Sequence, residues 1–146
     1  MRAIVAMLML LASVSASAGE IDGTAVLCKR LGVERQVMYE FRDDVPVRWQ
    51  VDVDNDEAVV KERDSVFQAD EYEISPALVT WTDPIGAKQL NRVTLELTMT
   101  TGEEGASERV FQCELFSSLE DFQRQLEALR VREQAEIDQQ MEHNKI

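Results

Sequence analysis

The stretch VPVRWQVDV, residues 45–53, decides the fold. Every odd-numbered position holds valine or tryptophan, and every even-numbered position holds proline or a polar residue. Successive side chains of a β-strand point to opposite faces, so this order gives one apolar face and one polar face. An antiparallel sheet that covers a core with one face requires such alternation. The stretch therefore predicts a half-buried antiparallel strand.

The same alternation continues on both sides of this strand, from residue 24 to about residue 116. A second clear strand covers residues 92–99, and shorter candidates cover residues 25–29, 36–42, 57–61, 66–68, 71–82 and 109–115. Turn-forming residues separate the candidates at 43–44, 54–56, 83–86 and 102–105. Connections this short leave no room for crossover helices, so we expect an antiparallel meander of about six to eight strands.

After residue 116 the apolar period lengthens to that of a helix. One stripe is formed by Leu119, Phe122, Leu126 and Leu129. Ser117 and Glu120 fit a capping box, which predicts Ser117 as the N-cap. Beyond Arg132 the stripe thins among charged residues and glutamines. We therefore expect a helix over 117–146 whose first half packs on the sheet and whose end is solvated.

These periods define the fold class as mainly β. We expect an antiparallel meander over residues 19–116, curled into a sandwich or an open barrel, followed by one C-terminal α-helix. Whether the sheet closes into a barrel stays open at this point.

The first 18 residues have the layout of a signal peptide. Arg2 provides a positive start, residues 3–12 are apolar, and residues 16–18 read Ala-Ser-Ala, a small-residue cleavage site. The apolar run is too short to span a bilayer. Cys28 lies too far beyond this run for a lipid anchor, so we expect no anchor and no membrane span. The prediction is an exported protein, periplasmic or secreted.

The chain has two cysteines, Cys28 and Cys113. An exported chain with two cysteines usually pairs them, so we expect a disulfide. Because the two residues lie in the first and last candidate strands, such a bond would join the ends of the sheet and shorten its exposed edges. The alternative is a pair of free buried thiols.

The charge balance excludes several classes of function. The chain has 28 acidic and 15 basic residues and a net charge of −13. Nucleic acids and anionic membranes need clustered lysines and arginines, so neither is an expected partner. The single histidine, His143, lies in the polar tail without a residue to orient it. With no nucleophile–base pair, phosphate loop or metal-ligand set, we expect no enzyme, no cofactor and no metal.

The acidic stretch from Asp52 to Glu73 is the strongest charge feature. Its start resembles a calcium loop, but Glu57 and Arg63 stand where that loop needs glycine and an acid. We interpret it as a hairpin tip. The acids either form a solvated face or dock a basic protein partner. The candidate docking residues are Asp52, Asp54, Asp56 and Glu57.

Aromatic residues fall in the candidate strands, where they are usually core. They include Tyr39, Phe41, Trp49, Phe67, Tyr72, Trp81 and Phe111. The alternative is that some of them line a groove for a ligand. The sequence thus favours an exported binding or interaction module of the cell envelope. A carrier of a small apolar ligand inside the sheet is the second hypothesis, and an enzyme is the third.

One resemblance supports this interpretation. Trp81, the stretch LNRVTLEL at 90–97, Cys113 and the polar tail ending at 144–146 resemble small exported bacterial β-sheet proteins of unknown function. The resemblance covers the C-terminal half and carries no catalytic motif. It implies a secreted β-domain and no activity. The partner and the oligomeric state stay open.

Overall fold

The computed structural model describes residues 21–63, 68–102 and 107–145 of the chain. The predicted signal peptide at 1–18 lies outside these residues. So do positions 66–67 of one candidate strand, including Phe67, and positions 103–105 of one predicted turn.

Nine strands form one antiparallel sheet in the described residues. They are β1 (Ala25–Arg30), β2 (Gln36–Arg42), β3 (Val45–Asp54), β4 (Glu57–Glu62), β5 (Glu73–Ile74), β6 (Leu78–Asp83), β7 (Gly86–Asn91), β8 (Glu96–Thr101) and β9 (Ser107–Phe116). Their order is β4-β3-β2-β1-β9-β8-β7-β6-β5. Two meanders, β1–β4 and β5–β9, are therefore joined side by side through the β1–β9 pair. The predicted mainly β, antiparallel fold is confirmed, but the described residues form nine strands rather than the expected six to eight.

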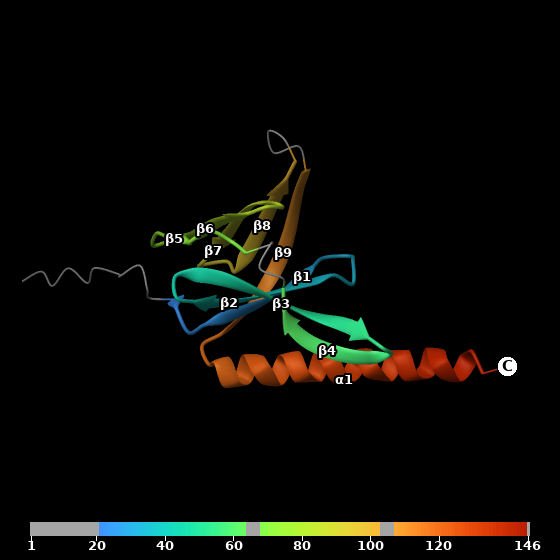
Figure 1. The fold of residues 1–146 in the computed structure, drawn as a ribbon. Coiled ribbons are helices and arrows are strands. Elements are labelled where there is room, and N and C mark those ends of the chain that lie inside the picture. Colours follow the sequence, from blue (N-terminus) through green and yellow to red (C-terminus); the bar gives the residue numbers. More distant parts are fainter. Residues whose placement is uncertain (1–20, 64–67, 103–106, 146) are drawn as a thin grey trace, which may run out of the picture.

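The sheet is curled into a half-barrel, so that β6 lies across from β2 (Figure 1). Aromatic side chains meet inside the curl. The ring centroids of Tyr39 and Trp81 are 5.1 Å apart, and those of Phe41 and Trp81 are 5.8 Å apart. Tyr39, Phe41 and Trp81 are all almost fully buried. The aromatic residues of β2 and β6 thus fill the interior, as the core interpretation predicts.

Tyr72 joins the two arms of the curl. Its backbone N–H donates to the carbonyl of Asp44 in the β2–β3 turn at 2.9 Å. Its hydroxyl donates to Oδ1 of Asp22 at 2.6 Å, and its ring lies 5.7 Å from that of Phe41. The segment before β5 therefore holds the open side of the half-barrel against β2.

Cys28 and Cys113 form the predicted disulfide. The two residues are direct partners in the β1–β9 pair, and both point into the core. As expected, the bond ties the first strand to the last, and because β1 and β9 pair with each other, neither is an edge of the sheet. The edges are β4 and β5.

The two edge strands are protected from pairing with another chain in different ways. β5 is only 2 residues long. β4 is covered by the helix α1 (Leu119–His143), and the side-chain Oε1 of Gln134 accepts from the backbone N–H of Ala58 at 2.8 Å. A short edge and a capped edge both offer few backbone groups for pairing with another chain.

The helix α1 lies below the β3–β4 hairpin and β1 (Figure 1). Its predicted stripe packs on the outer face of the sheet, where Phe122 and Leu126 are buried with Ala25, Leu27, Met38 and Phe116. The contact extends farther than the first half of the helix, because Ile137 is also buried. The N-cap is Ser118, one residue after the predicted Ser117, and its side chain accepts from the N–H of Asp121.

Three strand predictions differ from the structure. The single strand expected over 71–82 is divided into β5 and β6, which pair with each other. The strand expected over 92–99 begins only at Glu96, because the side chain of Asn91 accepts from the N–H groups of Val93 and Thr94 and forms a turn. Leu95 follows with a φ of 56° and Val93 is exposed. β7 was not predicted, because its inward position holds the charged residue Lys88 and the alternation of apolar residues is interrupted.

Candidate functional site

The predicted docking residues lie on the β3–β4 hairpin. Asp54 and Glu57 are the last pair of the ladder, and Asn55 and Asp56 form the turn with φ of 48° and 64°. Positive φ at both positions suits a hairpin turn whose twist matches that of the strands, and Asn and Asp tolerate it best. The predicted hairpin tip is therefore present, and its local sequence explains it.

The structure separates Asp52 from the other three candidates. The Asp52 carboxylate accepts from Lys61 Nζ at 2.7 Å and from Gln50 at 2.9 Å, so its charge is largely compensated. Asp54, Asp56 and Glu57 are exposed. Their side chains make no ion pair with any residue among 21–63, 68–102 and 107–145. We call these three residues the acidic tip.

The acidic tip is fixed in place by the helix. Gln134 of α1 accepts from Ala58 N–H and donates its Nε2 to the carbonyl of Asp56 at 3.1 Å. Val53 and Val59, both on the hairpin, are 54% and 38% exposed. The hairpin thus presents three carboxylates without ion-pair partners beside exposed apolar side chains. Its backbone is fixed by the hydrogen bonds to Gln134. Protein interfaces commonly combine charged and apolar groups.

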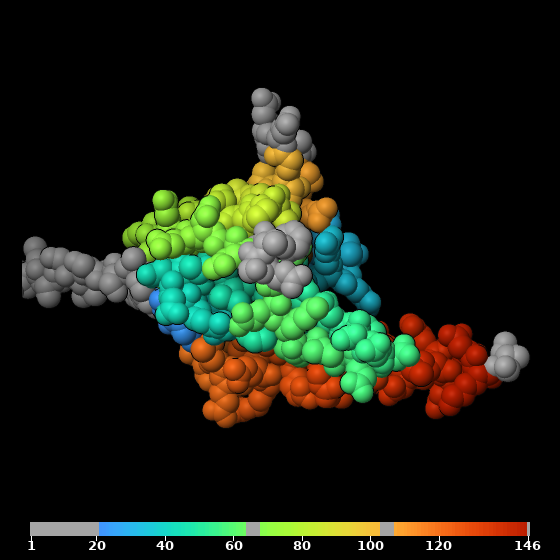
Figure 2. Space-filling model, viewed as in Figure 1, coloured from blue at the N-terminus to red at the C-terminus, as the bar shows by residue number. Residues whose placement is uncertain are grey.

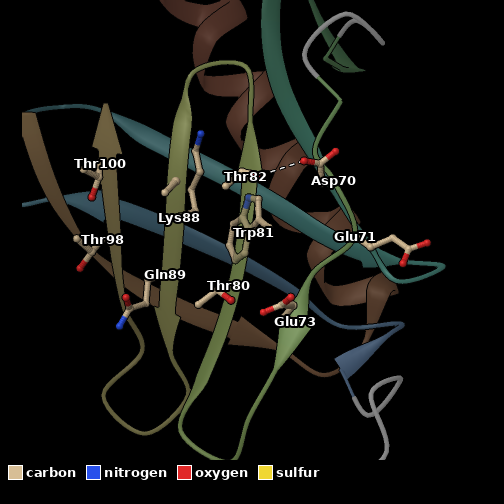
Figure 3. A pocket seen from close by; sticks show the side chains of 11 residues that line it. Asp70, Glu71, Glu73, Thr80, Trp81, Thr82, Lys88, Gln89, Thr98 and Thr100 are labelled. Atoms are coloured by element: carbon tan, nitrogen blue, oxygen red, sulfur yellow. Dashed lines mark hydrogen bonds between the residues drawn. The ribbon is translucent and has the colours of Figure 1, made fainter. Parts of the chain in front are cut away.

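The later acids of the same sequence stretch lie elsewhere. Asp70, Glu71 and Glu73 line a shallow groove of about 420 Å³ beside β6–β8 (Figure 3). Four threonines from β6 and β8 line it as well: Thr80, Thr82, Thr98 and Thr100. Thr82 Oγ1 donates to Asp70 Oδ2 at 3.0 Å. The acidic stretch from Asp52 to Glu73 is therefore two separate surfaces, of which only the acidic tip is on the hairpin.

A pocket that the sequence did not reveal lies at the mouth of the half-barrel. Its volume is about 220 Å³. Four arginines line it, and each comes from another part of the sheet: Arg35 before β2, Arg48 of β3, Arg63 after β4 and Arg109 of β9. Its remaining lining includes the apolar side chains of Val37, Ile85, Met99 and Phe111. We call it the arginine pocket.

Three of the four pocket arginines have no ion pair within the described residues, and the same holds for Arg30 and Arg132 outside the pocket. Arg42, Arg124 and Arg130 each form an ion pair with a nearby glutamate. Arg35, Arg48 and Arg109 form no ion pair with any described residue, although acids outnumber bases 28 to 15 in the chain. Three arginines without an ion pair among the described residues, Arg35, Arg48 and Arg109, are therefore gathered in one pocket of an acidic protein.

A buried ion pair lies near the arginine pocket. The Lys88 ammonium donates to Oδ1 of Asp83 and, at 3.1 Å, to the carbonyl of Gly86. Burial lowers the pKa of Lys88, and the bond to Asp83 opposes that change. The positive charges of Arg48 and Arg63 lower it as well. The charges of Arg48 and Arg63 therefore act on this buried ion pair.

Tyr39 has a buried hydroxyl that finds no hydrogen-bond partner in the described residues. Burial raises the pKa of Tyr39 to about 12, while the charge of Arg48 acts in the opposite direction. Arg48 is the direct cross-strand partner of Tyr39. The hydroxyl therefore lies within the field of the same arginine that lines the pocket.

A second, larger groove adjoins the arginine pocket. Its volume is about 660 Å³, and it runs between the β1–β2 hairpin, β3 and α1. Arg35, Arg48 and Gln50 line both spaces. β2 stops pairing with β3 at Met38 and Trp49, so the two hairpins splay apart beyond that point. Figure 2 shows the resulting notch between the β1–β2 turn and the β3–β4 hairpin.

Sequence reasoning missed the arginine pocket because its four arginines are scattered along the chain. A partial signal was present in residues 45–53. Arg48 and Gln50 belong to the polar face of that strand, which we expected to meet solvent. In the curled sheet this face turns toward the mouth of the half-barrel.

Comparison with known proteins gave no match: no family model, no curated protein and no solved structure is similar to this chain. The part of the chain that the structure describes holds no group of three or more histidine, cysteine, aspartate or glutamate residues placed to bind a metal ion. In the same part, α1 lacks the length of apolar sequence that a bilayer crossing requires.

Proposed function

We propose that this protein is an exported binding module of the cell envelope that docks a basic protein partner on its acidic tip. The observation that carries the proposal is the β3–β4 hairpin, whose turn is fixed by hydrogen bonds to the helix. Asp54, Asp56 and Glu57 are exposed and uncompensated, and Gln134 fixes the backbone that presents them. Uncompensated charge on a fixed surface steers an oppositely charged partner and selects its orientation.

The disulfide supports export. Disulfides persist in oxidising compartments and are rare in the cytosol, so the Cys28–Cys113 bond agrees with the signal-peptide layout of residues 1–18. A bond between two central strands also gives the small sheet resistance to unfolding outside the cell.

The filled interior favours the binding module over the carrier of an apolar ligand. The space between β2 and β6 is occupied by Tyr39, Phe41 and Trp81, whose rings are in contact. A ligand inside the curl would have to displace these side chains, and apolar carriers keep an open pocket of about 300 Å³ or more. The surface, by contrast, offers charged groups without partners.

The test is affinity capture from the exported fraction of the source cells. The bait is the disulfide-bonded chain without residues 1–18, and the comparison bait carries Asp54→Asn, Asp56→Asn and Glu57→Gln. A control bait with Glu96→Gln, Glu108→Gln and Glu114→Gln makes the same charge change on exposed positions of β8 and β9.

We expect the native and control baits to retain a basic protein that rising salt releases, and the tip variant to lose it. Equal capture by the tip variant, or no salt-sensitive protein on the native bait, would contradict the proposal.

A further inference from the structure

A separate feature, the arginine pocket, goes beyond the docking of a protein partner. We propose that it is a binding site for a phosphoryl group, either as free phosphate or as part of a small phosphorylated molecule. The site needs no residue of the acidic tip.

The first argument is convergence. Arg35, Arg48, Arg63 and Arg109 come from four separate segments and line one space of about 220 Å³. Like charges repel, and the repulsion is stronger in a half-buried pocket than in water. The fold brings these residues to one space, and an anion bound there would reduce their mutual repulsion.

The second argument is the absence of internal compensation. Within the described residues, Arg35, Arg48 and Arg109 have no carboxylate partner. Arg30 and Arg132 have none either, but they do not line this pocket. The chain has 28 acidic and 15 basic residues, so a shortage of carboxylates does not explain why these arginines have no partner. The three guanidinium groups are therefore left available to an external anion.

The chemistry of guanidinium favours a phosphoryl group over a carboxylate. Each guanidinium is a planar fork that donates two parallel hydrogen bonds to an oxyanion. A carboxylate carries one charge and has room for one or two forks. A phosphoryl group carries nearly two charges and three oxygens, so it can engage three forks at once.

The size of the pocket indicates a small ligand. A volume of about 220 Å³ lies below the usual range for drug-sized ligands, about 300–1,000 Å³. The negative field of the chain as a whole repels large polyanions, while the local pocket attracts a single group. The apolar lining by Val37, Met99 and Phe111 provides contacts for a body attached to the phosphoryl group.

The test is isothermal titration of the disulfide-bonded chain at constant ionic strength. The probes are inorganic phosphate, phenyl phosphate and benzoate. We expect saturable binding of both phosphates, and binding of benzoate at least about tenfold weaker. Tighter binding of phenyl phosphate than of phosphate assigns the site to a phosphorylated molecule, and equal binding assigns it to free phosphate; both results support the site.

Variants locate the binding. Arg48→Gln and Arg109→Gln should each weaken phosphate binding about tenfold, because each removes a charge-assisted hydrogen bond. Arg48→Lys keeps the charge, loses the fork and should give an intermediate loss. Arg124→Gln, on the exposed face of α1, is the matched control and should leave binding unchanged. Circular dichroism of each variant checks that the sheet is intact.

Three results would overturn the proposal. They are no saturable phosphate binding by the native chain, unchanged binding by both folded variants Arg48→Gln and Arg109→Gln, and benzoate binding equal to that of phosphate. Neutralisation of the acidic tip should leave phosphate binding in place, so this site and the proposed protein docking can fail independently.

Discussion

Gln134 of the helix is hydrogen-bonded to the backbone of Ala58 at the edge of the sheet, with Oε1 accepting from the N–H at 2.8 Å. The same side chain donates to the carbonyl of Asp56 at 3.1 Å. One glutamine therefore caps an edge strand and fixes the hairpin turn that presents the acidic tip. This contact links the position of the helix to the surface on which the proposed function depends.

Gln134→Ala should loosen the hairpin without unfolding the sheet. The amide of Ala58 loses its acceptor, so its hydrogen exchange should become faster, and the free energy of unfolding should fall by about 1 kcal/mol. Hydrogen-exchange mass spectrometry and urea unfolding measure the two effects. Gln139→Ala, at an exposed position of the same helix, is the control. Unchanged exchange at the β3–β4 hairpin would show that Gln134 does not hold it.

Removal of the disulfide should destabilise the protein strongly. The bond joins residues separated by 85 positions, and the chain-entropy model assigns about 4.6 kcal/mol to a loop of that length. Urea unfolding of the oxidised and the reduced chain measures the difference. Alkylation without reductant, followed by mass spectrometry, should find no free thiol in the exported protein. Two alkylated cysteines would contradict the bond.

The buried pair of Lys88 and Asp83 should respond asymmetrically to substitution. Asp83→Asn leaves a buried ammonium without its carboxylate, and should cost about 3–5 kcal/mol at neutral pH. Lys88→Met should cost less, because Asp83 keeps its hydrogen bonds from the N–H groups of Ile85 and Gly86. Urea unfolding of both variants tests the order. A larger loss for Lys88→Met would show that the ammonium is not the group that needs compensation.

The two tyrosines of the chain should make its stability fall in alkali. Burial raises the pKa of Tyr39 from 10.0 to about 12, and burial together with the bond to Asp22 raises the pKa of Tyr72. A raised folded-state pKa stabilises the folded protein fully below the unfolded pKa, and the benefit is lost as pH rises through the folded pKa. The loss from Tyr39 should thus develop between about pH 10 and pH 12.

A lowered pKa for Lys88 has the opposite sign, since deprotonation of this buried group on the way to pH 10.5 favours the folded state. Tyr39→Phe and Tyr72→Phe separate the contributions of the tyrosines. At neutral pH, Tyr39→Phe should be stabilising by about 1 kcal/mol, because its buried hydroxyl has no partner in the described residues. Tyr72→Phe should destabilise by about 1 kcal/mol, because it loses the bond to Asp22.

Thermal unfolding across the alkaline range, with phenolate absorbance as a second signal, measures these effects. Ionisation of both tyrosines near pH 10 in the folded protein would contradict the account of their burial.

The alternation of residues 36–42 and 45–53 was enough to predict β2 and β3, although β2 is buried on both faces, with Tyr39 inside the curl and Met38 under the helix. The apolar stripe of α1 was predicted because its apolar residues recur at the period of a helix. β7 was missed because its inward-pointing residue, Lys88, is charged, and the ion pair with Asp83 that compensates this charge cannot be predicted from the alternation of apolar residues. The turn after Asn91 was missed because a side-chain hydrogen bond overrides the alternation of residues 93–99.

Of the two sites, the one formed by residues close in sequence could be predicted, and the one assembled from distant segments could not. The acidic tip lies within one hairpin, so its members are close in sequence and could be predicted, although the pairing of Asp52 with Lys61 depends on the register between β3 and β4. The arginine pocket is assembled from β2, β3, β9 and the end of β4, which meet only because the sheet curls. No local sequence pattern predicts that these distant segments come together.

The most direct test of the central claim is the association rate of the captured partner with the native chain and with the tip variant, measured against ionic strength. If the acidic tip steers the partner, the rate for the native chain should fall steeply as salt rises. Neutralisation of Asp54, Asp56 and Glu57 should lower it about tenfold at low salt and flatten its salt dependence, while neutralisation of Glu96, Glu108 and Glu114 should change it far less. An association rate that ignores both salt and the tip substitutions would contradict docking at the acidic tip.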